Sequence, residues 1–205
     1  MLHYTAMATP EAALERLCTP DHEVSAHYLI APSGEVVAMV DEVSRAWHAG
    51  RGRWAGLDDI NSRSVGIEIA NDGASPFSSL AIEALIPLIR AISNRWGLAP
   101  KDVIGHSDMA PQRKCDPGRR FDWRRLAREG VSVWPDDATA QEASRADFTT
   151  AARGFGYPDC PDDVLLDAFR QRFRPYAQGP LDAWDVGMAQ ALARRFPVDP
   201  RAALA

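Results

Sequence analysis

The chain has 205 residues, of which 46% are hydrophobic and 25% are charged, and its formal net charge is −5. This composition is that of a globular chain of one or two units, and the negative charge argues against nucleic acid as a partner. The sequence contains no run of 18 apolar residues, so we expect no membrane span, and its first ten residues lack the features of a signal peptide. Three cysteines form no even disulfide framework, which favours a reducing compartment.

Several short stretches in the first 70 residues have the pattern of strands. Residues 24–30 alternate, and residues 35–40 follow a Pro-Ser-Gly turn, so the two predict a hairpin. Residues 65–70 predict a buried strand. Residues 2–5 predict the end of a strand that carries His3, and we expect that strand to be short because only two residues precede His3.

Helix signals stand between and after these strands. Thr9 and Pro10 are typical of a helix start, and apolar positions from Ile82 to Trp96 indicate one face of a helix that ends at Gly97. A strand at Val103 and a basic helix near residues 122–128 follow. We therefore predict an α/β fold with a central mixed β-sheet flanked by helices.

A change of composition at residues 134–141 indicates a boundary. Beyond it the pattern is helical, with segments that end near Gly154, start at Pro161 and start near Asp182. We predict two domains, residues 1–135 and a small three-helix bundle at residues 136–205.

The most informative stretch runs from Val103 to Gly118 and contains His106, Lys114 and Asp116. Imidazole and carboxylate are ordinary zinc ligands, and Lys114 is one of only two lysines in an Arg-rich chain. His and Asp ten residues apart also occur by chance, so a metal site is one interpretation and an ordinary loop is the other.

A second informative residue is Glu68, a carboxylate inside an apolar strand. A buried carboxylate needs a partner, a proton or a polar cleft, so Glu68 is either half of a structural ion pair or a general base. The loop at residues 44–63 contains Trp47 and His48, which either line a pocket or pack beneath the loop.

With these residues in place, the chain resembles the zinc-dependent N-acetylmuramoyl-L-alanine amidases related to phage lysozyme-type amidases and peptidoglycan-recognition proteins. The matching stretches are H-Y-T-A at 3–6, V-S-A-H-Y-L-I at 24–30, A-W-H-A-G at 46–50, S-V-G-I-E-I at 64–69 and G-H-S-D-M-A-P-Q-R-K-C-D-P-G at 105–118. The resemblance is greatest to bacterial members with a C-terminal peptidoglycan-binding-like helical domain, matched here by A-F-R-Q-R-F-R-P at 168–175.

The resemblance implies Zn²⁺ as cofactor, with His3, His106 and Asp116 as its ligands; Cys115 is the alternative third ligand. It implies Glu68 as general base, in place of a tyrosine where this chain has Ala26, and Lys114 as the cation that stabilises the oxyanion. His48, Trp47 and Asn61 are expected substrate contacts, although His48 could instead tie down its loop.

The expected reaction is zinc-dependent hydrolysis of the amide between N-acetylmuramic acid, expected in its 1,6-anhydro form, and L-alanine of the stem peptide. We expect a cytoplasmic monomer in cell-wall recycling. The alternatives are a periplasmic amidase of intact peptidoglycan whose leader is missing and a peptidoglycan-binding protein without catalysis. Since every expected catalytic residue precedes Asp137, a chain ending there is predicted to fold and to hydrolyse a small muropeptide.

Overall fold

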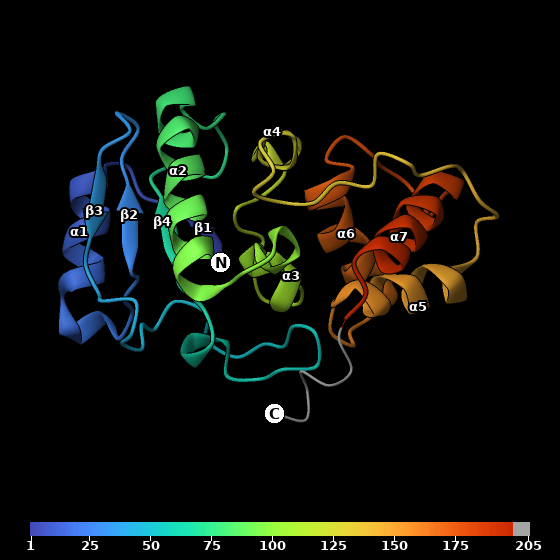
Figure 1. Cartoon of the computed structure of the whole chain (residues 1–205), viewed down its shortest axis with the longest axis horizontal. Helices are drawn as coiled ribbons and strands as arrows, with labels where there is room; N and C mark the ends of the chain where they lie inside the picture. Colours follow the sequence, from blue (N-terminus) through green and yellow to red (C-terminus); the bar gives the residue numbers. More distant parts are fainter. Residues whose placement is uncertain (199–205) are drawn as a thin grey trace.

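A four-stranded sheet with strand order β1-β4-β2-β3 forms the centre of the first two thirds of the chain (Figure 1). The computed structural model describes residues 1–198. Its strands are β1 (Leu2–Tyr4), β2 (Tyr28–Ile30), β3 (Val36–Ala38) and β4 (Ile67–Ile69), and its α-helices are α1 (Pro10–Cys18), α2 (Ser79–Trp96), α3 (His106–Met109), α4 (Trp123–Arg128), α5 (Arg145–Phe155), α6 (Asp162–Phe173) and α7 (Ala183–Arg195).

The sheet is mixed, as predicted. Strand β4 pairs in parallel with both β1 and β2, and β2 pairs antiparallel with β3 to form the expected hairpin. The strand predicted at residues 24–30 begins only at Tyr28, because the residues before it bond to a loop: the Ser25 N–H donates to the Trp47 carbonyl. The alternating pattern therefore begins four residues before the strand that pairs in the sheet.

The prediction of a strand at Val103 is wrong. A 3₁₀ turn ends at Asp102, and the only ladder contact here within residues 1–198 is a single parallel bridge between Leu2 and Gly105. The Leu2 N–H also donates to the Ile104 carbonyl at 2.8 Å. The segment lies beside β1 for two residues and then turns into α3, so it is too short to form a strand.

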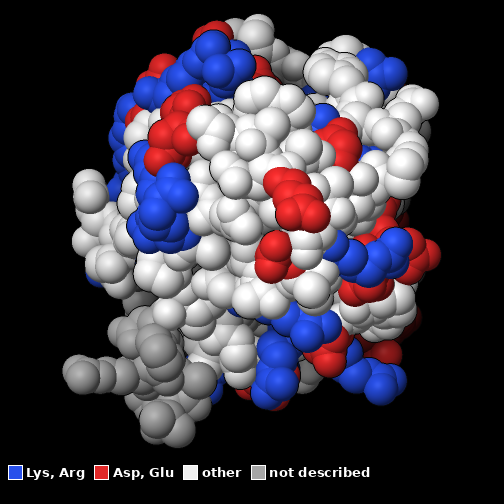
Figure 2. All heavy atoms as spheres, turned by 90° about the vertical axis from the view of Figure 1, so that its right-hand side faces the viewer, with Lys and Arg blue, Asp and Glu red and all other residues white. Residues whose placement is uncertain are grey.

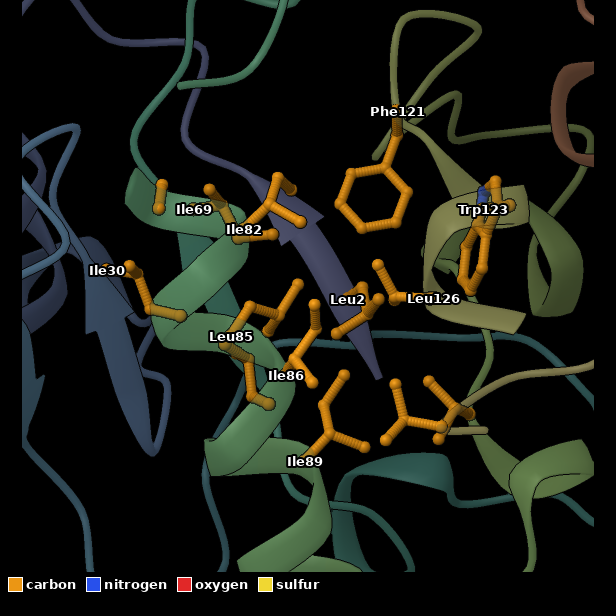
Figure 3. Packing of buried hydrophobic residues seen from close by; sticks show 14 of the residues in the cluster. Leu2, Ile30, Ile69, Ile82, Leu85, Ile86, Ile89, Phe121, Trp123 and Leu126 are labelled. Carbon is orange, nitrogen blue, oxygen red and sulfur yellow. The ribbon is translucent and has the colours of Figure 1, made fainter. Parts of the chain in front are cut away.

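Helix α2 covers one face of the sheet and forms the main core with it. Figure 3 shows Ile82, Leu85, Ile86 and Ile89 of α2 lying against Leu2 of β1, with Leu126 of α4 closing the other side. Since side chains alternate across a strand, burying Leu2 on this face directs His3 to the opposite face. The core thus determines where the first histidine points.

The last three helices have their own apolar cluster, which contains Phe148, Leu165, Phe169, Phe173 and Val186. This confirms a small helical bundle after the sheet, in which Trp184 of α7 is half exposed. Figure 2 shows acidic and basic side chains lying next to one another across the face that carries these helices.

The bundle also packs on the first part of the chain. The Trp54 ring meets the rings of Phe155 and Tyr157 edge to face, at centroid distances of 5.6 and 5.3 Å. The Ala55 N–H donates to the Gly156 carbonyl at 2.9 Å. The loop at residues 44–63 was predicted either to line a pocket or to pack beneath itself. Its Trp54 packs against the helical bundle.

Candidate active site

The register of the sheet places His3 and Glu68 side by side. They are direct partners in the parallel ladder between β1 and β4, so their side chains leave the same face of the sheet. His3 is almost fully buried at the centre of its strand. The strand is short, as predicted, but pairing along its whole length holds the histidine in place.

His106 and Asp116 come to the same point from the segment after the sheet. His106 begins α3, and the Ser107 N–H donates to the Asp116 carbonyl at 2.9 Å, which fixes the motif loop against the helix. One carboxylate oxygen of Asp116 lies 2.8 Å from Nδ1 of His3 and 3.0 Å from Nδ1 of His106, and the two Nδ1 atoms are 3.0 Å apart. Three buried donor atoms therefore converge on one point.

Hydrogen bonds on the far side of each imidazole fix its tautomer. Nε2 of His106 lies 2.8 Å from the Ala49 carbonyl, which can only accept, so this nitrogen carries the proton and Nδ1 of the neutral ring carries a lone pair. Burial lowers the pKa of His3 to about 4, so its ring is neutral at pH 7. Its Nε2 lies 3.1 Å from Nδ1 of His48.

His48 completes the same argument for His3. Its pKa lies well below the ordinary value because of burial, and its Nε2 faces the Ser64 carbonyl at 3.4 Å, so Nδ1 of His48 accepts from His3. Nδ1 of His3 then carries a lone pair, like Nδ1 of His106. Two lone pairs and a carboxylate oxygen face one another without a proton between them, an arrangement that a bound divalent cation stabilises. Two imidazoles and one carboxylate are also a normal ligand set for zinc.

Glu68 stands at the edge of this group as a partly exposed acid with one buried carboxylate oxygen. Its Oε2 has no hydrogen-bond partner among the described residues. Burial first, and then the charge of Asp116, raise the pKa of Glu68 to about 8 against the opposing charge of Lys114. The ion-pair interpretation of Glu68 would need a bonded partner, so the structure favours a carboxyl that exchanges protons.

A cavity of about 400 Å³ opens above these residues. Glu68, Lys114 and Trp47 line it together with the three converging residues. Its wall also includes Tyr4 and Arg113, which sequence reasoning did not single out. Both stand beside singled-out residues, but nothing in their type or spacing distinguishes them from surface side chains.

The three predicted substrate contacts lie in different places. Trp47 is 56% exposed at the cavity, beneath the Arg45 guanidinium. His48 lines the cavity but is buried and bonded to His3. The structure does not bring Asn61 to the cavity: its buried carboxamide oxygen accepts from the N–H groups of His48 and Ala49. Asn61 shapes the loop because two backbone donors there need an acceptor.

The alternative ligand Cys115 and the two other histidines, His27 and His22, lie outside the converging group. Cys115 is exposed, and its Sγ lies 3.1 Å from the Tyr4 hydroxyl, away from the converging atoms. His27 is buried in the fold and accepts from the Gly66 N–H, whereas His22 is exposed. The donor set is therefore His3, His106 and Asp116.

Comparison with known proteins points in one direction. Residues 1–119 match the family model of N-acetylmuramoyl-L-alanine amidases. The chain is 33% identical to the N-acetylmuramoyl-L-alanine amidase AmiD of Escherichia coli K12, over 97% of this chain and 83% of that protein. It is 39% identical to the 1,6-anhydro-N-acetylmuramyl-L-alanine amidase AmpD of Enterobacter cloacae, but only over half of this chain and 55% of that protein.

Two solved structures share the fold over nearly the whole chain. One is E. coli AmiD in complex with anhydro-N-acetylmuramic acid-L-Ala-D-γ-Glu-L-Lys, with a TM-score of 0.89 and 32% identity over 97% of this chain and 89% of that one. The other is AmpDh3 of Pseudomonas aeruginosa in complex with an anhydromuramic pentapeptide, with a TM-score of 0.82 and 34% identity over 96% of this chain and 91% of that one.

Proposed function

The chain belongs to the N-acetylmuramoyl-L-alanine amidase family, and we propose that it hydrolyses the amide between 1,6-anhydro-N-acetylmuramic acid and L-alanine of the stem peptide during cell-wall recycling. The observation that carries this proposal is the convergence of two imidazole lone pairs and a carboxylate oxygen beside Glu68, whose Oε2 is buried without a hydrogen-bond partner among the described residues. The solved relatives hold anhydromuropeptides, which supports the anhydro form of the sugar.

His3, His106 and Asp116 are the proposed zinc ligands. A zinc ion held by them would supply a Lewis acid that activates water and stabilises negative charge on the carbonyl oxygen. The protein's part is to turn Nδ1 of both histidines toward the site, through the bonds of their Nε2 atoms with the Ala49 carbonyl and with His48. A neutral, oriented imidazole binds a metal without first losing a proton.

Glu68 is the proposed general base. It accepts a proton from the attacking water as the oxygen bonds to the carbonyl carbon, and it returns that proton to the alanine nitrogen as the C–N bond breaks. The products are a lactyl carboxylate and a peptide with a free amine. A pKa raised to about 8 by burial suits a group that must both take up and release a proton near neutral pH.

Lys114 is the proposed oxyanion partner. It lines the cavity, and its charge acts on Glu68. The ammonium would stabilise the negative oxygen of the tetrahedral intermediate in a site partly shielded from water. Trp47 presents an exposed indole at the same cavity, and we assign it a stacking contact with the sugar.

For the helices α5–α7, we propose binding to polymeric peptidoglycan, a role that belongs to the periplasmic alternative. A cavity of about 580 Å³ lined by Phe148, Asp163, Leu166 and Leu181 supports this role. The test is co-sedimentation with sacculi of the wild type and of Leu166→Arg, which alters that cavity and leaves the amidase cavity untouched. Equal binding of the two proteins would remove this proposal.

The three unpaired cysteines among residues 1–198 support a cytoplasmic enzyme, and the alternative is a periplasmic amidase that acts on intact peptidoglycan. A non-catalytic binding protein would not need Glu68 beside a complete ligand set. No helix among the described residues could span a membrane. A monomeric state and the lack of a nucleic-acid partner stay predictions.

Mass spectrometry of the products tests the reaction. The protein is incubated with an anhydromuropeptide and, separately, with intact sacculi. We expect release of the free stem peptide from the soluble muropeptide, with slower or no release from sacculi. Rapid release from sacculi alone would favour the periplasmic alternative, and no release from either substrate would contradict the amidase.

A further inference from the structure

A buried carboxylate stands two residues after His106 and depends on the C-terminal helices. Asp108 is fully buried in α3. Its Oδ2 accepts from the Gly105 N–H at 2.8 Å and thereby caps the turn on which His106 stands. The same oxygen accepts from Nη1 of Arg172 at 2.6 Å, and Oδ1 accepts from the Tyr157 hydroxyl at 2.6 Å.

Arg172 holds the same segment at a second place. Its Nη2 donates to the Val103 carbonyl at 3.0 Å, and its guanidinium lies 4.3 Å above the Trp123 ring. Arg172 is itself only 2% exposed. One side chain from α6 therefore bonds to both ends of the segment 103–108, which carries His106.

Asp108 and Arg172 depend on each other for charge compensation. Asp108 and Arg172 are both taken out of water, and removing one member of such a pair leaves the other as an uncompensated buried charge. With Arg172 removed, the Oδ2 of Asp108 loses its bond from Nη1 and the buried carboxylate loses its cationic partner, so the side chain is driven toward solvent. That movement loosens its bond to the Gly105 N–H, so the first turn of α3 loses its cap.

The stretch A-F-R-Q-R-F-R-P at 168–175 can now be understood from its contacts. Arg170 pairs with the buried Asp185, and Arg174 bonds to Asp182 and Asp185, all within the helical bundle. Only Arg172 of the three reaches the first part of the chain. These arginines therefore stabilise the interior, and Arg172 connects the two parts.

We propose that Arg172 and Tyr157 are positioning residues of the amidase site: through Asp108 they hold the α3 turn that presents His106 to the metal. The C-terminal helices thus contribute to the metal site by holding the turn that carries one of its ligands. This inference rests on the proposed zinc site, and it assigns a role in that site to residues that lie outside its cavity.

The test compares two buried arginines in the full chain. Arg172→Met removes the pair with Asp108, whereas Arg170→Met removes an equally buried pair with Asp185 inside the bundle. Zinc affinity is measured by competition with a chromophoric chelator, and stability by urea unfolding. We expect both variants to be less stable and only Arg172→Met to bind zinc about 10–100-fold more weakly, the usual effect of losing a residue that orients a ligand.

A second readout needs no metal. Hydrogen exchange of the amides from Gly105 to Met109 should be faster in Arg172→Met than in Arg170→Met. If wild-type protein bound no zinc, the proposed function would fail while this comparison still tested the inference. Tyr157→Phe, which removes one bond to Asp108 and keeps the ring, should change both readouts in the same direction by less, and it decides the matter if Arg172→Met does not fold. The inference would be overturned if folded Arg172→Met or Tyr157→Phe bound zinc as tightly as the wild type and exchanged the amides from Gly105 to Met109 at the wild-type rate.

Discussion

Glu68 has a buried carboxylate oxygen without a hydrogen-bond partner among the described residues, which is unfavourable for stability and useful for proton transfer. Glu68→Gln keeps the size of the side chain and removes its acid. We expect kcat to fall about 10²-fold or more, the usual scale of general acid–base catalysis, while zinc stays bound. We also expect no loss of stability, because the native side chain makes no bond with Oε2. Steady-state kinetics, metal content and urea unfolding of one preparation check all three, and a near-normal kcat would exclude the role.

The choice between Cys115 and Asp116 as third ligand is a second question at this scale. Asp116 faces both histidines, whereas Cys115 is exposed and faces Tyr4. Asp116→Ala should therefore lose both zinc and activity, since it removes one of three protein ligands. Cys115→Ser should keep most of both. Loss of zinc in Cys115→Ser with retention in Asp116→Ala would reverse the assignment.

Lys114 can be tested against the other lysine of the chain. Lys101 is partly buried, and its Nζ donates to the Pro197 carbonyl. Lys101→Ala therefore removes one ammonium outside the amidase cavity and serves as the control. Lys114→Ala should lower kcat by about 10²–10³-fold, as removal of an oxyanion donor does, with zinc retained. Lys114→Arg should recover little, because the guanidinium is larger and its donors fork. Equal kcat in Lys114→Ala and Lys101→Ala would show a solvated loop lysine.

At the scale of elements, the sequence predicted what depends on local pattern. Thr9 accepts from the Ala12 N–H as an N-cap, Gly97 ends α2 with φ of +66°, and Asp122 caps α4. It could not show the register that places His3 beside Glu68, because that register comes from pairing between distant strands. It also predicted a strand at Val103, because β-branched residues there resemble a strand although a turn follows at once.

Glu42 fastens the hairpin to the end of α2 and gives a pH-dependent prediction. Its carboxylate accepts from the Tyr28 hydroxyl and the Trp96 indole N–H, both at 2.6 Å, and it pairs with Arg95. The bonds from Arg95 first, and then those from Tyr28 and Trp96, lower the pKa of Glu42 to about 2, against the opposing effect of burial. A carboxyl with a lowered pKa stabilises the fold above its unfolded pKa near 4.5, and that contribution is lost as the pH falls toward 2.

Glu42→Gln should therefore destabilise the protein at pH 7 by about 1–2 kcal/mol, the lower part of the range for bonds to a charged group because water screens this pair. The difference from wild type should shrink as the pH falls from 4.5 toward 2. Urea unfolding at several pH values measures it, with Glu15→Gln on an exposed position of α1 as the control. A difference independent of pH would show that the charge of Glu42 contributes nothing.

At the scale of the whole molecule, composition and motifs predicted two parts, and the division at residue 135 stays a prediction. What they could not show is the contact between the parts. Asp108 and Arg172 are 64 residues apart, and in the sequence each is typical of an ordinary charged residue at the surface. Val133 and Trp134, near the predicted boundary, pack in the cluster of the helical bundle. A boundary placed by composition can therefore cut through a shared core.

This contact bears on the expectation that a chain ending at Asp137 folds and works alone. Such a chain would lose both side-chain partners of the buried Asp108, Tyr157 and Arg172, and it would uncover Trp54 where Phe155 and Tyr157 now cover it. We expect the shortened chain to unfold at lower urea concentration, to bind zinc more weakly and to hydrolyse a soluble muropeptide more slowly than the full chain. Because the soluble substrate needs no wall binding, any loss reflects the amidase site itself. A shortened chain with full zinc affinity and full turnover would show that residues 1–137 suffice and that the helices serve only the polymer.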